Sequence, residues 1–308
     1  MTTEKIKGLI AAPPTAFHPD GSVNLDIIPI HAKFLNANGV VGAFLNGTTG
    51  EGFSLTIEER MAIAEQWVKN APEGLRVIVH VAHTCPKSAW EMASHAEKIG
   101  AWGIAEIAPI FFKPSRVEDL VEQASKTASY APSLPFYFYH MPQMSGAHFL
   151  MNDFLRTADP LIPNLAGIKY THENFVDLTL SLEYGGGKYD ILHGRDETLL
   201  CALSLGCRGA VGSTYNVMAP LYIHLMDAFD AGNFEEARRL QSLSIRIINI
   251  LSGTTCFFSA LKETMKMLGL DMGDVREPLK KISPHEIRRL KDDLTRAGFF
   301  DICSRITD

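Results

Sequence analysis

Short apolar runs recur along the chain, and segments with apolar residues at helical spacing separate them. Most of the runs are continuous apolar stretches rather than strict alternations of apolar and polar residues. This is typical of parallel strands that are covered on both faces. The runs predict eight parallel strands, at residues 9–17, 40–46, 76–81, 104–111, 135–140, 165–170, 190–193 and 209–213.

The segments between the runs predict helices. The segment 56–70 begins with Thr56-x-x-Glu59, a capping box in which two side chains satisfy free amides at a helix start. Its apolar residues then recur on one helical face. Similar patterns predict helices over 86–99, 117–130, 174–184 and 197–205.

The alternation of strands and helices predicts an α/β fold, a (β/α)8 TIM barrel that spans residues 1–230. An open doubly wound sheet is the alternative, but it usually carries a G-x-G-x-x-G turn after its first strand. Here Pro13-Pro14-Thr15 stands in that place. No strand pattern follows, and 234–250, 255–268 and 284–297 predict a C-terminal three-helix appendage, a helical domain over 231–308.

Charge and cysteine content narrow the function classes. Lys and Arg total 29 against 35 Asp and Glu, a net charge of −6, which argues against nucleic acid as a partner. The five cysteines form no C-x-x-C pair, so we expect no zinc or disulfide framework and a reducing, cytoplasmic location. No apolar segment approaches the ~20 residues that span a bilayer, so no membrane partner is expected.

Strand 165–170 contains the strongest candidate for chemistry. If Lys169 faces the barrel interior, the alternation of side chains places Leu165, Gly167 and Thr171 there too, and Ala166, Ile168 and Tyr170 towards the helices. A desolvated lysine has a lowered pKa and a nucleophilic amine, which can form a Schiff base with a ketone. The alternative is a lysine at a strand end that reaches solvent.

Tyr139 is the last residue of its face in the preceding strand, 135–140, and is expected at the same height as Lys169. A phenol in that place can pass protons to and from the reacting carbon, although an aromatic cluster that caps the barrel is the alternative. After the second strand, Thr48 and Thr49 lie between glycines in a turn whose N–H groups can bind a carboxylate. Such a turn is by itself also typical of a tight loop.

Two further strand ends carry polar residues. Gly194, Asp196 and Glu197 follow the seventh strand, and carboxylates there can accept hydrogen bonds from sugar hydroxyls. The acidic pair could instead favour the N-terminus of the next helix. Ser213 follows the eighth strand, where Gly212-Ser213 could alternatively form a phosphate site.

Three motifs in this order resemble one family. Gly47-Thr48-Thr49-Gly50-Glu51, Tyr139-His140-Met141-Pro142 and Gly167-Ile168-Lys169 are similar to the signature of the dihydrodipicolinate synthase / N-acetylneuraminate lyase superfamily of class I, pyruvate-dependent aldolases. The resemblance covers the whole chain. It is closest to the N-acetylneuraminate lyase branch, because Met144 stands where the synthases usually carry an arginine, and the loop 109–113 lacks their tyrosine.

The resemblance implies reversible cleavage of N-acetylneuraminate to N-acetylmannosamine and pyruvate, with Lys169 as the Schiff-base lysine and Tyr139 as the catalytic tyrosine. It implies no metal and no other cofactor. It also implies a homotetramer, for which the apolar loop 110–112 is a candidate contact or, alternatively, a cover for the barrel mouth. Arg195 departs from the pattern, since relatives commonly carry an aromatic or aliphatic residue there. The implied substrate-binding residues are Thr48 and Thr49 for the pyruvate carboxylate, Thr171, Gly194, Asp196, Glu197 and Ser213 for the sugar chain, and Phe258 from the helical segment.

The sequence also allows three other hypotheses. A metal-dependent aldolase would need a histidine or carboxylate cluster, and the spacing of His80 and His83 puts them on opposite faces of a strand. A related aldolase could act on another 2-keto-3-deoxy sugar acid. A non-catalytic sugar-acid sensor would have no use for a nucleophilic amine.

Overall fold

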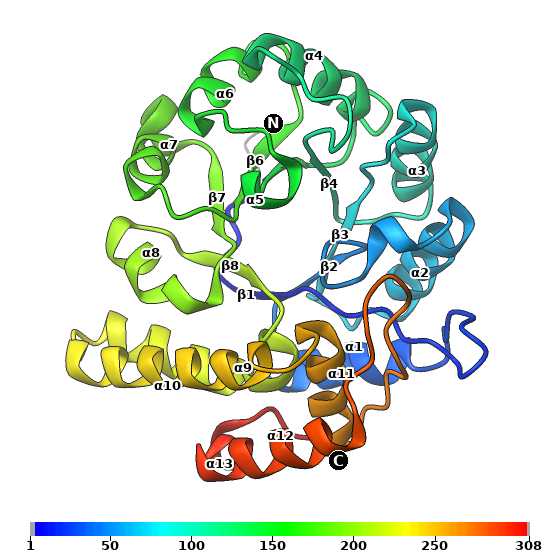
Figure 1. Ribbon diagram of the computed structural model, residues 1–308. Helices are drawn as coiled ribbons and strands as arrows, with labels where there is room; N and C mark the ends of the chain where they lie inside the picture. The colour runs from blue at the N-terminus through cyan, green and yellow to red at the C-terminus, as the bar shows by residue number, and fades with distance from the viewer. Residues whose placement is uncertain (1–3, 307–308) are drawn as a thin grey trace.

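Eight parallel strands close into a barrel in the computed structural model, which describes residues 4–306 (Figure 1). Each strand pairs with the next along the chain, and β8 pairs with β1. The TIM barrel that the apolar runs predict is therefore confirmed. The strands are β1 Gly8–Ala11, β2 Gly42–Leu45, β3 Arg76–His80, β4 Gly103–Ile107, β5 Phe136–His140, β6 Leu165–Tyr170, β7 Asp190–His193 and β8 Gly209–Gly212.

Helices surround the barrel and connect its strands. The capping box of α2 is present: Thr56 Oγ1 accepts from the N–H of Glu59 at 3.2 Å, and Glu59 accepts from the N–H of Thr56 at 2.9 Å. The helices are α1 Ile28–Ala37, α2 Ile57–Asn70, α3 Pro86–Lys98, α4 Val117–Ala128, α5 Pro142–Ser145, α6 Met151–Ala158, α7 Phe175–Gly187, α8 Leu199–Leu205 and α9 Tyr215–Asp230, with short 3₁₀ turns at Gly52–Ser54 and Asp196–Thr198.

The helical pattern alone did not predict α1, α5, α6 and α9. Helices α5 and α6 are short, with four and eight residues, so few turns repeat. In the first part of α9 nearly every residue is buried, which removes the polar stripe that marks an amphipathic helix. Helix α8 begins at Leu199 rather than at 197, because 196–198 form the 3₁₀ turn.

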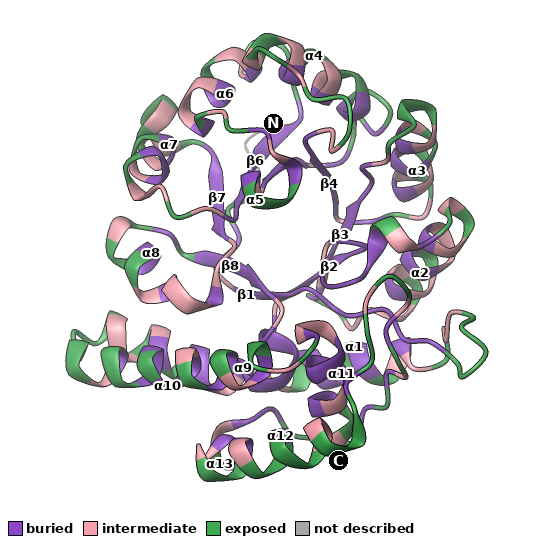
Figure 2. Ribbon diagram, viewed as in Figure 1, coloured by how far each residue is buried: buried purple, intermediate pink, exposed green. Residues whose placement is uncertain are grey.

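Two apolar cores hold the barrel. One lies between the strands and the surrounding helices, and Figure 2 shows the strands buried while the helices expose their outer sides. The other fills the barrel interior. Its members are Ile6, Ile10, Ala12, Phe44, Ile78, Ala82, Ala105, Ile107, Tyr137, Tyr139, Ala166, Leu192 and Val211.

The predicted facing of β6 is wrong at its start. Ala166 belongs to the interior core and Leu165 to the outer one, the reverse of the expected alternation. The cause is a shift in the pairing with β5: Phe136 pairs with Leu165, but Tyr137 pairs with Gly167. Ala166 is thus an extra residue in β6, and the side chains up to this point lie on the faces opposite to those that a regular alternation predicts. Beyond it, Ile168 and Tyr170 lie in the outer core as predicted.

The C-terminal helices follow the barrel and pack at its side, against α9 and α8 (Figure 1). They are α10 Phe234–Ser252, α11 Phe257–Met267, α12 Pro284–Arg296 and α13 Phe299–Ile302, so a short fourth helix adds to the predicted three. The turn between α9 and α10 contains residue 231, where a helical domain is expected to start. The division into 1–230 and 231–308 stays a prediction.

Among residues 4–306, no single helix has the length and apolar character needed to cross a membrane. One pair, Phe234–Ser252 with Phe257–Met267, meets the criterion of length and composition together but is bent by 111°.

Candidate active site

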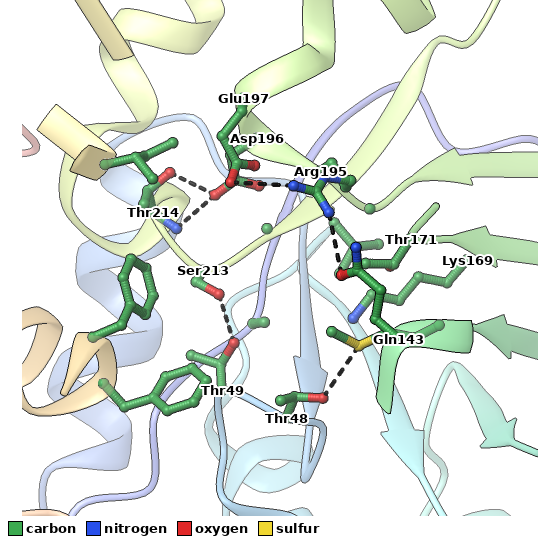
Figure 3. A pocket seen from close by; sticks show the side chains of 18 of the residues that line it. Thr48, Thr49, Gln143, Lys169, Thr171, Arg195, Asp196, Glu197, Ser213 and Thr214 are labelled. Atoms are coloured by element: carbon green, nitrogen blue, oxygen red, sulfur yellow. Dashed lines mark hydrogen bonds and ion pairs between the residues drawn. The ribbon is translucent and has the colours of Figure 1, made fainter. Parts of the chain in front are cut away.

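A cavity of about 360 Å³ opens at the carboxyl ends of the strands (Figure 3). This is the end of a TIM barrel where reactive groups stand. All ten residues that the sequence analysis selects line this one cavity: Thr48, Thr49, Tyr139, Lys169, Thr171, Gly194, Asp196, Glu197, Ser213 and Phe258. They come from the ends of five strands and from the start of α11.

Lys169 lies near the end of β6 and pairs in register with Tyr139 of β5. Its side chain is buried, and Nζ lies 4.0 Å from the ring centres of both Phe44 and Tyr139. Burial lowers the pKa of Lys169 to about 7, against a smaller opposing effect of Asp196. A large share of this amine is therefore uncharged near neutral pH.

The Tyr139 hydroxyl faces the turn after β2. It lies 3.2 Å from Thr48 Oγ1 and donates to Met141 Sδ at 2.9 Å. Burial raises the pKa of Tyr139 to about 12, opposed by the hydroxyls of Thr48 and Thr171. The phenol thus carries its proton at neutral pH and is ready to donate it.

The turn that carries Thr48 and Thr49 is tight. A side chain at Gly52 would bring Cβ to 1.9 Å from the backbone oxygen of Asn46, so only glycine fits there. Within the described residues, the N–H groups of Thr48 and Thr49 donate to no protein acceptor. Thr49 Oγ1 lies 2.7 Å from Ser213 Oγ, which joins this turn to the end of β8. Free N–H groups beside these hydroxyls suit a carboxylate.

Two glycines make room for polar side chains on the opposite wall. A Cβ at Gly212 would lie 1.9 Å from Asp196 Oδ1, and a Cβ at Gly194 would lie 1.9 Å from Thr171 Oγ1. The Thr171 hydroxyl is buried and makes no hydrogen bond of normal geometry to residues 4–306. Its contact with the Tyr139 hydroxyl lacks that geometry, so a ligand in the cavity can supply the hydrogen bond.

Asp196 is oriented by a residue that the sequence analysis did not select. Its carboxylate accepts from the backbone N–H of Thr214 at 2.9 Å and from Thr214 Oγ1 at 2.5 Å. Burial and the neighbouring Glu197 raise the pKa of Asp196 to about 7. Thr214 directly follows Ser213, so its place in the sequence could have marked it.

Among the other cavity residues, four that received no role in the sequence analysis add an aromatic, charged, sulfur or amide group. Phe257 precedes Phe258 at the start of α11, and adjacency could have marked it. Arg195 forms ion pairs with Glu173 at 3.0 Å and Glu197 at 3.7 Å. The remaining two are Met141, whose sulfur accepts from Tyr139, and Gln143, which accepts from Arg195 at 3.4 Å.

No cluster of His, Cys, Asp or Glu within residues 4–306 is arranged to hold a metal ion. His80 is buried, and its Nδ1 lies 3.0 Å from the backbone oxygen of Asn46. His83 instead accepts from the N–H of Cys85 at 3.0 Å. The two histidines thus contact different backbone groups, one at Asn46 and one at Cys85.

Comparison with known proteins agrees with this architecture. The model of the dihydrodipicolinate synthetase family matches residues 5–297. N-acetylneuraminate lyase of Xenopus tropicalis is 37% identical over 90% of this chain and 91% of its own length. The structure of Proteus mirabilis N-acetylneuraminate lyase superposes with a TM-score of 0.93 at 40% identity, covering 96% of this chain and 100% of that one. A Ruminococcus gnavus sialic acid aldolase, in the structure of its catalytic lysine mutant, has a TM-score of 0.89 at 29% identity, covering 95% and 96%.

A closed parallel barrel with these matches defines the class: the chain belongs to the dihydrodipicolinate synthetase family. Within that family its relatives at 37% and 40% identity are N-acetylneuraminate lyases, which are carbon–carbon lyases. The predicted membership is confirmed.

Proposed function

We propose that this protein is a class I aldolase that reversibly cleaves N-acetylneuraminate to N-acetylmannosamine and pyruvate. One observation carries the proposal: a buried lysine amine with a pKa of about 7 lies in the cavity beside a protonated phenol. The names of the relatives support the same substrate. The catalytic lysine of the Ruminococcus gnavus aldolase supports the same chemistry.

The first step is attack of the neutral Lys169 amine on C2 of the open-chain sugar acid. The resulting carbinolamine loses water with help from a proton donor, and an iminium forms. Tyr139 is the proton donor, because it lines the same cavity as Lys169 and burial keeps its hydroxyl protonated. The N–H groups of Thr48 and Thr49 hold the substrate carboxylate during this step. Ser213, whose Oγ lies 2.7 Å from Thr49 Oγ1, belongs to the groups assigned to the sugar chain.

The second step breaks the bond between C3 and C4. The C4 hydroxyl loses its proton, the electrons of the C3–C4 bond pass to the iminium nitrogen, and N-acetylmannosamine leaves an enamine behind. Tyr139 relays the proton, with the substrate carboxylate as partner. Protonation of the enamine carbon and hydrolysis of the iminium then release pyruvate and restore the amine. The iminium accepts the electrons that a metal would otherwise stabilise, so this route uses no metal cofactor.

The opposite wall binds the sugar chain. Thr171, Asp196 and Glu197 offer hydrogen bonds to its hydroxyls, and Gly194 leaves the space that Thr171 occupies. Phe258 contributes an apolar surface from α11.

We also propose that the protein is located in the cytoplasm and assembles as a homotetramer. All five cysteines are free thiols, which supports a reducing compartment. Phe111 and Phe112 are 76% and 85% exposed in the loop after β4, an apolar surface that suits a contact between subunits.

The test measures pyruvate released from N-acetylneuraminate, together with peptide mapping after borohydride reduction in the presence of pyruvate. We expect turnover and a single pyruvyl group on Lys169. Binding of the sugar acid without turnover would indicate a sensor instead. Faster turnover of another 2-keto-3-deoxy sugar acid under the same conditions would move the substrate to that acid.

A further inference from the structure

A buried ion pair ties the turn of Thr48 and Thr49 to the C-terminal helices. Glu51, in this turn, accepts from Lys262 of α11 at 2.6 Å. The two side chains are 0% and 1% exposed, and 211 residues separate them in sequence. An ion pair this far from water is held strongly only when its other hydrogen-bonding groups are also satisfied.

Both partners meet that condition. The second carboxylate oxygen of Glu51 accepts from the N–H of Arg276 at 2.7 Å, and Lys262 Nζ also donates to the backbone oxygen of Asp274 at 2.8 Å. Arg276 in turn donates twice to Glu59 of α2, at 2.7 and 2.8 Å. The turn, α11 and the segment 274–276 thus form one connected network.

The backbone of Glu51 adopts a conformation that is costly for a residue with a side chain. Its φ is 55°, a left-handed conformation that favours glycine and that few other residues adopt. Gly52 beside it approaches Asn46 so closely that no Cβ fits. A glutamate in this strained place is expected where its carboxylate has a specific partner.

Helix α11 also reaches the cavity directly. Phe257 and Phe258, its first two residues, line the cavity, and Lys262 lies one helical turn after Phe258. The first residues of the helix therefore line the cavity. One helical turn further on, Lys262 binds Glu51 in the loop that carries Thr48 and Thr49.

We propose that Glu51 and Lys262 are positioning residues, which fix the N–H and hydroxyl groups of Thr48 and Thr49 for the pyruvate carboxylate. This inference rests on the function proposed above, in which that turn binds pyruvate. It makes the C-terminal helices a part of the catalytic centre. Neither residue touches the substrate.

The experiment follows borohydride trapping on Lys169 as a function of pyruvate concentration. For Lys262→Met we expect the half-saturating pyruvate concentration to rise about tenfold or more, which corresponds to the loss of about one hydrogen bond to a charged group. The trapping rate at saturating pyruvate stays at the unsubstituted value, because Lys169 and Tyr139 are unchanged. Lys266→Met is the matched control: Lys266 lies on the same helix, is exposed, and pairs with Asp271 at 2.8 Å. Its half-saturating concentration is expected to be unchanged.

A second variant separates positioning from folding. Lys262→Met leaves a buried carboxylate unpaired and can prevent folding, whereas Glu51→Gln with Lys262→Met removes both charges. The double variant should fold, and its half-saturating pyruvate concentration should still be higher than that of the unsubstituted protein. The inference is wrong if the double variant has the half-saturating pyruvate concentration of the unsubstituted protein. It is also wrong if Lys266→Met raises that concentration as much as Lys262→Met does. Absence of any adduct in the unsubstituted protein would instead overturn the proposed Schiff base.

Discussion

The amine of Lys169 lies 4.0 Å from the centre of the Tyr139 ring, and the two residues are register partners in β6 and β5. The phenol hydroxyl, however, points towards Thr48 and Met141 rather than bonding the amine. The ring therefore shields the amine from water, while the hydroxyl faces the turn where we place the carboxylate. The two parts of one side chain have separate tasks, and this separation can be tested.

Replacing the lysine tests the covalent step. Lys169→Ala removes the amine, and we expect no pyruvyl adduct after borohydride reduction and no pyruvate release from N-acetylneuraminate. Mass mapping of the reduced protein measures the adduct. Lys188→Ala, which removes an amine exposed at the protein surface, should trap pyruvate normally. An ordinary adduct yield in Lys169→Ala would contradict the mechanism.

Replacing the tyrosine tests the proton relay. Tyr139→Phe keeps the ring over the amine and removes only the hydroxyl, so we expect turnover to fall by about 10²–10⁴-fold while imine trapping continues. Steady-state pyruvate release and borohydride trapping measure the two steps separately. Undiminished turnover would remove Tyr139 from this role.

Tyr137→Phe is the control, two residues earlier on the same face of β5. Its hydroxyl donates to Asp190 at 2.9 Å, away from the cavity lining. We expect turnover to remain and the free energy of unfolding to fall by about 1–3 kcal/mol, because the buried Asp190 carboxylate loses a donor. Denaturant unfolding measures the loss. A large fall in turnover with this variant would show that the effect at Tyr139 is not specific.

The pH dependence of trapping tests the environment of the amine. Burial lowers the pKa of Lys169 to about 7, and only the uncharged amine attacks a ketone. The trapping rate should therefore be low in acid, increase with pH around a midpoint near 7, and level off at higher pH, where the amine is uncharged. Cyanoborohydride reduction at saturating pyruvate, from acid to alkaline pH, measures this midpoint. A midpoint near that of an ordinary lysine would show an amine exposed to water.

Replacing groups on the sugar wall tests substrate selection. Thr171→Val keeps the shape but removes a buried hydroxyl without a protein hydrogen bond of normal geometry. Glu197→Ala removes a carboxylate of the cavity rim. We expect kcat/KM for N-acetylneuraminate to fall by about tenfold or more, the loss expected for one hydrogen bond, with pyruvate trapping little changed. Equal losses for both ligands would refute the assignment of this wall to the sugar.

Much of the architecture could be predicted because its signals are local. The apolar runs mark all eight strands, and Thr56 with Glu59 marks the start of α2 correctly. Strand ends are also local features, and parallel strands bring their carboxyl ends to one mouth of the barrel. For that reason the strand ends supply residues that line a single cavity, whereas Phe258 of α11 was selected only through the family resemblance.

Tertiary structure decided what depends on neighbours distant in sequence. The exchange of Leu165 and Ala166 between faces comes from the pairing of β5 with β6, which no pattern within β6 reveals. The pKa of Lys169 depends on how completely other strands exclude water from its amine. The contact of Glu51 with Lys262 crosses 211 residues. Sequence patterns determine which elements form and where their polar ends lie, because helix and strand periods are set by the local backbone, whereas burial and ion pairing exist only once the barrel has closed.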